Sequence, residues 1–162
     1  DYRSAPGMPK SFIAQFATAT PGDKLKLYLN LVAGKQNDYR KTVQGDVVAS
    51  FSASSQFGAG INATFQANKL DVDSSGNFRS LNWGGTALHL NYDPSKWVGL
   101  TFRGEYIVDD DGYLGIDRAF TPTVSANFRV DNLTIIPEFS ASPATTFIIA
   151  AVYHFSRDTE QE

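Results

Sequence analysis

Cysteine is absent from this sequence of 162 residues, and charged side chains of either sign are scarce. The lack of cysteine excludes disulfide frameworks, thiolate zinc sites and cysteine nucleophiles. Charged residues make up 19% of the chain, below the roughly 25% that is usual for a soluble domain. Histidine occurs only as His89 and His154, which leaves little for a histidine metal cluster.

Basic stripes and long apolar runs are also missing. The net charge is −3 and the pI is near 5.3, so no nucleic-acid partner is expected. No apolar run reaches the roughly 18 residues that a membrane-spanning helix needs. Residues 1–10 have no apolar core and do not resemble a signal peptide. The hydrophobic fraction of 42% nevertheless excludes a disordered chain.

Alternation with a period of two is the dominant pattern that is present. In residues 57–68, Phe, Ala and Ile occupy every odd position, and Gly, Asn, Thr and Gln occupy every even one. Such alternation predicts β-strands with two unlike faces. The Gly84-Gly85 pair is expected to form a bulge that resets the faces of its strand. The chain is therefore predicted to be all-β with about nine strands, at 11–20, 23–35, 43–54, 57–68, 81–92, 97–108, 123–130, 133–141 and 145–155.

The predicted connections fall into two classes. Short turns are expected at 21–23, 54–56, 93–96 and 131–132, and longer polar loops at 35–42, 69–80 and 109–121. The connection at 142–144 is short, although its place in the series predicts a longer one. Short turns at one end and longer loops at the other are typical of a transmembrane β-barrel.

The side chains of the two faces favour a membrane over water. The polar faces carry mostly small uncharged side chains, and the apolar faces are continuous. Because lipid leaves no backbone group solvated, such a sheet must close into an antiparallel transmembrane β-barrel. The alternative is a soluble barrel or sandwich with its apolar face inside, which would bind an apolar ligand. Aromatic side chains at strand ends predict membrane-interface girdles: Phe51, Phe57, Tyr92, Trp97, Tyr106, Tyr153 and Phe155.

Bacterial barrels have an even number of strands, so nine visible strands predict the C-terminal part of a larger barrel. We expect one barrel domain over 1–155, with a loop segment at 1–10 and strands from about 11. Residues 156–162 are expected to form a disordered polar tail.

Four segments carry a resemblance to a known family. They are WGGTALHLNY at 83–92, GLTFRGEY at 99–106, DNLTIIPEF at 131–139 and AAVYHF at 150–155. The chain resembles the C-terminal half of the OmpL-like β-barrel porins of Bacteroidota and related Gram-negative bacteria. The resemblance implies an outer-membrane location, contact with lipid, and passive passage of small solutes. It also implies recognition by the outer-membrane assembly machinery through the last strand, where Tyr153 and Phe155 alternate.

A scaffold function is the second hypothesis, in which loops 69–80 and 109–121 bind protein partners in an envelope complex. No nucleophile–base pair or phosphate loop is visible, so the sequence predicts neither an enzyme nor a cofactor. A barrel hydrolase would need catalytic residues in strands that precede this chain.

Charged side chains on the polar faces are candidates for the barrel lumen. Arg103, Glu105, Arg129 and Glu138 come from strands close in sequence and are expected to form an ion-pair ladder. The ladder would either select solutes or stiffen a filled interior. The full set of predicted lumen-lining residues is Lys24, Lys26, Asp46, Arg103, Glu105, Arg129 and Glu138.

Two acidic segments are weak candidates for a metal site. The first resembles the start of a calcium loop, but Asn82 stands where the twelfth-position glutamate is expected. The second is an acidic cluster after residue 108. Ordinary polar loops are the favoured interpretation of both. The candidate ligands are Asp71, Asp73, Ser75, Asn77, Asp109 and Asp111.

Overall fold

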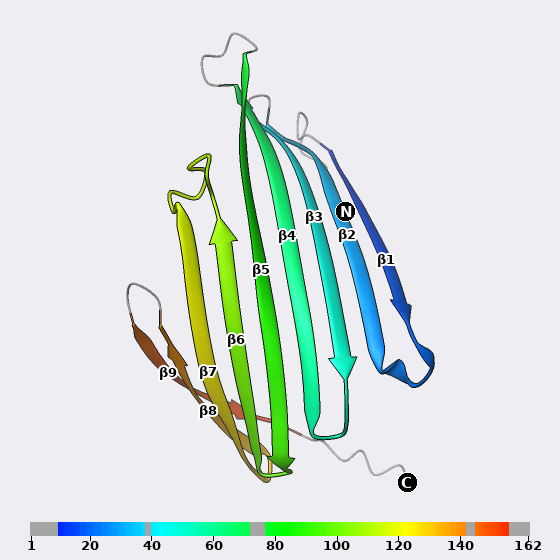
Figure 1. Ribbon diagram of the computed structural model, residues 1–162, viewed down its shortest axis with the longest axis vertical. Helices are drawn as coiled ribbons and strands as arrows, with labels where there is room; N and C mark the ends of the chain where they lie inside the picture. Colours follow the sequence, from blue (N-terminus) through cyan, green and yellow to red (C-terminus); the bar gives the residue numbers. More distant parts are fainter. Residues whose placement is uncertain (1–9, 38–39, 72–76, 142–144, 156–162) are drawn as a thin grey trace.

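The protein is one antiparallel sheet of nine strands, each paired with the next along the chain (Figure 1). The computed structural model describes residues 10–37, 40–71, 77–141 and 145–155. The predicted all-β class and strand number are confirmed. The strands are β1 (Ser11–Ala19), β2 (Leu25–Asn37), β3 (Arg40–Ser52), β4 (Phe57–Asp71), β5 (Phe78–Ser95), β6 (Val98–Val108), β7 (Arg118–Val130), β8 (Leu133–Ser140) and β9 (Thr146–Tyr153).

Four close turns lie at one end of the sheet (Figure 1), and the short link between Asn37 of β2 and Arg40 of β3 lies at the other. β1 and β2 are joined through a short 3-10 turn, Pro21–Asp23, in which Gly22 has a φ of +76°. The turns β3–β4, β5–β6 and β7–β8 lie at the same end, which we call the turn end. The opposite, loop end carries the connections that the sequence predicted to be longer. Within the described ranges, no helix is long and apolar enough to cross a bilayer.

The strands extend further at the loop end than the sequence predicted. β4 continues to Asp71 and β5 begins at Phe78, within the predicted loop 69–80, and β7 begins at Arg118. Loops 35–42, 69–80 and 109–121 are shorter for the same reason. Polar residues such as Lys69 and Ser80 replace the apolar series here, so no alternation marks a strand. The backbone of β4 nevertheless stays in register with β5.

The predicted bulge at Gly84-Gly85 is wrong. Pairing of β4 with β5 runs without a register shift from Phe57↔Tyr92 to Asp71↔Phe78. The irregularity of β5 lies instead between Tyr92 and Ser95, beside the turn. Because the register is continuous through Gly84-Gly85, all of β5 keeps the same two faces.

Cross-strand register separates a polar face from an apolar face. The neighbouring rows that show this most plainly cross from β2 to β9. The apolar row is Leu25, Phe51, Ala59, Leu90, Phe102, Val124, Phe139 and Phe147. The polar row is Lys26, Ser50, Gly60, His89, Arg103, Thr123, Ser140 and Thr146.

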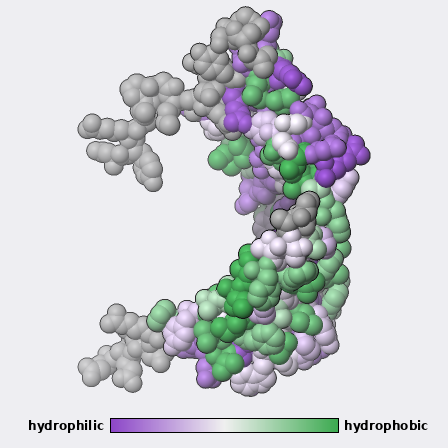
Figure 2. Space-filling view, turned by 90° about the vertical axis from the view of Figure 1, so that its left-hand side faces the viewer, coloured by the Kyte–Doolittle hydropathy of each residue, from purple (hydrophilic) through white to green (hydrophobic). Residues whose placement is uncertain are grey.

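Burial on this sheet is inverted relative to a soluble protein. Among the described residues no hydrophobic side chain is buried, whereas Thr42, Gln66, Asn68 and Thr123 of the polar face are. Figure 2 shows the sheet curved into an open C, with hydrophobic side chains below and hydrophilic ones gathered at the loop end. The crowded polar face is therefore the concave one, and the apolar face is the exposed convex one. Edges β1 and β9 are not paired with each other in the described part of the sheet.

Candidate functional site

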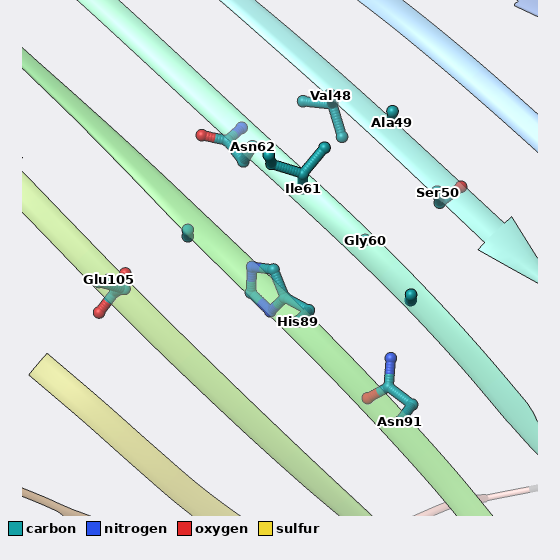
Figure 3. Close-up of a pocket in the computed structure, with 11 residues that line it drawn as sticks. Val48, Ala49, Ser50, Gly60, Ile61, Asn62, His89, Asn91 and Glu105 are labelled. Carbon is teal, nitrogen blue, oxygen red and sulfur yellow. The ribbon is translucent and has the colours of Figure 1, made fainter.

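A recess with several polar side chains in its wall lies on the concave face, towards the turn end. Its volume is about 460 Å³, and it spans β3 to β6. Figure 3 shows Asn62 on β4, His89 and Asn91 on β5, and Glu105 on β6 around it. Side chains that both donate and accept hydrogen bonds can replace part of the hydration shell of a polar solute.

Most of the predicted lumen-lining charges lie on the concave face. Register places Lys26, Asp46, Arg103, Glu105, Arg129 and Glu138 there. Lys24 differs, because it lies in the turn before β2 rather than on a strand. Lys26 Nζ is 3.1 Å from Asp23 Oδ2, and Asp46 accepts hydrogen bonds from Gln44 and Thr64. Positive and negative charges are interspersed, so the face has no single sign of charge.

The predicted four-residue ion-pair ladder does not form among the described residues. Arg103 Nη2 lies 3.3 Å from Glu105 Oε2 on the same strand, so the structure brings these two together. Arg129 Nη2 instead lies 2.7 Å from Asp93 Oδ1 near the β5–β6 turn. Glu138 lies opposite Ser125 in the β7–β8 register. The ladder prediction failed because Asp93 reaches Arg129 across the turn end, and sequence proximity gave no sign of this.

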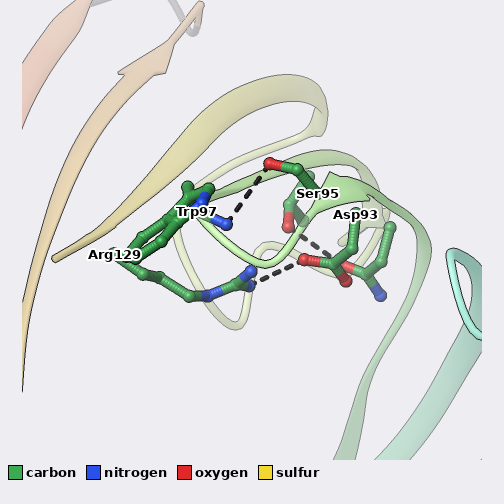
Figure 4. Close-up of polar contacts among 6 residues, drawn as sticks. Asp93, Ser95, Trp97 and Arg129 are labelled. Carbon is green, nitrogen blue, oxygen red and sulfur yellow. Dashed lines mark hydrogen bonds and ion pairs between the residues drawn. The ribbon is translucent and has the colours of Figure 1, made fainter. Parts of the chain in front are cut away.

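The Arg129–Asp93 pair is drawn in Figure 4. It lies directly beside Gly99 of β6. A Cβ atom on residue 99 would collide with Asp93 Oδ1 and lie 2.7 Å from Arg129 Nη2. The Trp97 N–H donates to Ser95 Oγ at 3.3 Å and orders the same turn. Because residue 99 is glycine, there is room beside β6 for the Arg129–Asp93 ion pair, which links β7 to the β5–β6 turn.

Gly99→Ala is expected to displace this ion pair and lower the free energy of unfolding by about 1 kcal/mol, the magnitude of a half-exposed charge-assisted contact. Gly58→Ala is the matched control, because Gly58 lies on the same face and its Cβ would meet nothing closer than 3.6 Å. Denaturant titration in detergent micelles measures both. The cost of Gly99→Ala should also shrink in an Asp93→Ala background, and an undiminished cost would contradict this account.

The connection between β6 and β7 is braced by a buried carboxylate. Asp109 is 1% exposed, and its side chain accepts hydrogen bonds from the Tyr113 N–H at 2.7 Å and the Leu114 N–H at 2.6 Å. Its backbone N–H donates to the Asp117 carbonyl at 2.8 Å. These contacts hold residues 109–117, which we call the braced loop, in one conformation.

The braced loop also contacts strands other than its own. The Asn82 N–H of β5 donates to Asp111 Oδ2 at 2.8 Å. Arg40 of β3 lies on the concave face, and its guanidinium carbon is 4.9 Å from the centroid of the Tyr113 ring. Since β3 and β6 are separated by two strands, the contact brings the loop over the concave face at the loop end. The braced loop therefore narrows this end of the concave face.

The metal candidates are dispersed rather than gathered. Asp109 and Asp111 bind backbone N–H groups, and Asp110 pairs with Arg118 at 3.0 Å. Asp71 ends β4 and Asn77 directly precedes β5, whereas Asp73 and Ser75 lie outside the described residues. In the described ranges, no three His, Cys, Asp or Glu side chains are grouped to hold an ion.

The predicted interface aromatics gather mainly at the turn end. Tyr106 lies towards the opposite end, near the end of β6. The Tyr153 and Phe155 rings contact each other edge to face at 4.7 Å. The side chains at or beside the turn end are Phe51, Phe57, Tyr92, Trp97, Tyr153 and Phe155.

Sequence reasoning missed several residues of the concave face. His89 was not assigned to the lumen, because the supposed face reset at Gly84-Gly85 obscured the parity of its strand. If the two faces of β5 are assumed to alternate without a break, His89 lies on the same face as Asn91. That assumption would have placed the His89 side chain beside the recess. Arg40 and Tyr113 had no comparable signal, because their contact joins a strand to a distant loop.

A polar concave face behind an exposed apolar face is the arrangement of a membrane barrel wall. Residues 4–158 match the model of the family described as "Putative beta-barrel porin-2, OmpL-like". The chain belongs to this family. The match confirms the predicted resemblance to OmpL-like porins, although the Bacteroidota assignment stays a prediction. Membership makes the protein a porin-like barrel and implies an outer-membrane location in general. Comparisons with curated proteins and with solved structures gave no match.

Proposed function

We propose that this porin-like barrel lets small polar solutes diffuse passively through the outer membrane along its concave face. The observation that carries the proposal is the inverted burial: polar side chains are crowded inside the curve and apolar ones are exposed outside. The recess adds polar groups that can exchange with the hydration shell of a solute. Interspersed charges favour neutral or zwitterionic solutes over ions of one sign.

The orientation follows from the two kinds of connection. Short turns face the periplasm and longer loops face outward in bacterial barrels. The braced loop would then lie at the external mouth and set its width. The last strand, β9, ends at Tyr153, and Phe155 follows it at the periplasmic end, where the assembly machinery would recognise the strand.

Single-channel recording of the full-length protein in planar bilayers tests the proposal. We expect Ala87→Trp to lower the conductance about twofold or more, because the indole would fill the recess that Ala87 lines. Ala63→Trp is the matched control, since Ala63 lies on the convex face and its indole would contact lipid. Equal conductance of both variants and the wild type would place the current path elsewhere.

A scaffold barrel is the second candidate, favoured by the extension of β4 and β5 beyond β6 at the loop end (Figure 1). This projection would present residues 69–80 and the braced loop to envelope proteins. Wild-type protein without conductance above background would favour the scaffold over the channel.

A further inference from the structure

Three lysines form one cross-strand row on the convex face at the loop end. Lys35 of β2 lies opposite Lys41 of β3, and Lys41 lies opposite Lys69 of β4. All three side chains are exposed. Their parity is that of Leu31, Val43 and Phe65, so they stand on the same face as the apolar side chains and not on the polar one.

Placing like charges directly opposite one another on a sheet is unfavourable unless something compensates. None of the three lysines forms an ion pair with another described residue. Lys41 Nζ lies 4.4 Å from the centroid of the Phe78 ring, which is a cation–π contact and brings no negative charge. Asp71 follows Lys69 on the same face, so one carboxylate flanks three ammonium groups. Counted over the described residues, the row therefore keeps a net positive charge that an external anion would compensate.

The row stands at the border of the apolar convex face. The next convex row towards the turn end contains Ala33, Val43 and Ala67, and the following one contains Leu31 and Phe65. A lysine at such a border extends its methylene stem along apolar surface and keeps its ammonium group at the polar interface. This is the depth at which a bilayer presents its headgroups.

We propose that Lys35, Lys41 and Lys69 bind the phosphate groups of lipids around the barrel. Neighbouring strands are about 4.8 Å apart, so three ammonium groups span on the order of 10 Å, enough for the phosphates of one or two lipids. The row faces sideways, in continuity with the apolar face, so a lipid can cover both at once. A soluble anion would satisfy the charge but would gain nothing from the apolar rows. The inference rests on lipid contact with the convex face and not on solute passage.

The test is native mass spectrometry of the full-length protein in mild detergent with added phosphatidylglycerol. Wild-type protein should retain bound lipid, and Lys35→Gln/Lys69→Gln should bind it about thirtyfold more weakly, since each basic residue near an anionic lipid contributes about fivefold in affinity. Lys24→Gln/Lys96→Gln is the matched control, because it removes the same charge from the turn end. Equal weakening by both pairs would show general charge attraction and overturn the site.

Two further measurements are needed. The first distinguishes a lipid ligand from a soluble anion, and the second distinguishes loss of the lysine site from loss of the channel. Inorganic phosphate should leave lipid retention unchanged, and displacement by phosphate at similar concentration would overturn lipid as the ligand. Heat-induced gel mobility shows whether each variant is folded. Conductance of Lys35→Gln/Lys69→Gln should match the wild type, so loss of lipid retention and loss of solute passage are separate results.

Discussion

Replacing Ile61 with arginine is expected to destabilise the protein in a lipid bilayer by about 1–3 kcal/mol, because the cost of a cation on the lipid face falls from about 2–4 kcal/mol at the midplane to about 0–1 kcal/mol near the interfaces. Ile61 is 47% exposed on the convex face, and it lies within the apolar rows of β4, nearer to Phe57 at the turn end than to Lys69 at the loop end. Register places its side chain on the face opposite to that of Asn62, among the apolar residues. The charge would therefore stay in hydrocarbon.

Asn62→Arg is the control for this substitution, because the adjacent side chain points into the concave recess. There the guanidinium can meet water and Glu105, so we expect a change in the free energy of unfolding below about 1 kcal/mol. Urea titration in phospholipid vesicles, followed by tryptophan fluorescence, measures both variants. If Asn62→Arg proved the more damaging of the two, the assignment of the faces would be reversed.

Replacing Asp109 with alanine is expected to release the braced loop. The carboxylate of Asp109 is nearly fully buried and satisfies two backbone N–H groups. Leaving both without this acceptor should cost about 2–6 kcal/mol of local stability, at roughly 1–3 kcal/mol for each part-buried hydrogen bond to the carboxylate. The Tyr113 ring would no longer be held over Arg40, and the external mouth should widen. Limited proteolysis within 109–117 and the conductance should both increase.

Asp110→Ala tests whether the braced loop is held by the buried hydrogen bonds of Asp109 or only by the negative charge of the loop. Asp110 carries the same charge in the same loop, but its ion pair with Arg118 is solvent-exposed, with both side chains 58% accessible. Exposed pairs contribute about 0–1 kcal/mol, so the loop should stay resistant to the protease. Equal cleavage of the two variants would mean that the Asp109 hydrogen bonds do not hold the loop.

Strand number and facing were predictable because they depend on local alternation. In residues 57–68 most apolar positions meet an apolar or glycine position across the sheet, so pattern and register agree, and Thr86 and Asn82 opposite Ala63 and Ala67 are the exceptions. The failures occur where that constraint stops. Beyond Lys69 the polar sequence no longer distinguishes the two faces, and strand ends cannot be located from alternation.

Contacts between side chains distant in sequence could not be predicted for a different reason. Arg129 and Asp93 are 36 positions apart, and their meeting depends on the empty space above Gly99. Many acidic partners for Arg129 fit the alternation equally well. The Arg40–Tyr113 contact likewise depends on the path of a loop, which hydrophobic periodicity does not specify.

The order of the strands also determines how this sheet can form. Every strand pairs with its sequence neighbour, so each ladder closes a short stretch of chain and the contact order within the described sheet is low. Folding can therefore proceed one hairpin at a time, without waiting for remote segments to meet. Each added strand forms hydrogen bonds with the exposed backbone edge of the strand before it, and the added strand then becomes the new unpaired edge. Because unpaired backbone groups are costly in lipid, this stepwise path leaves only the growing edges to be shielded during membrane insertion.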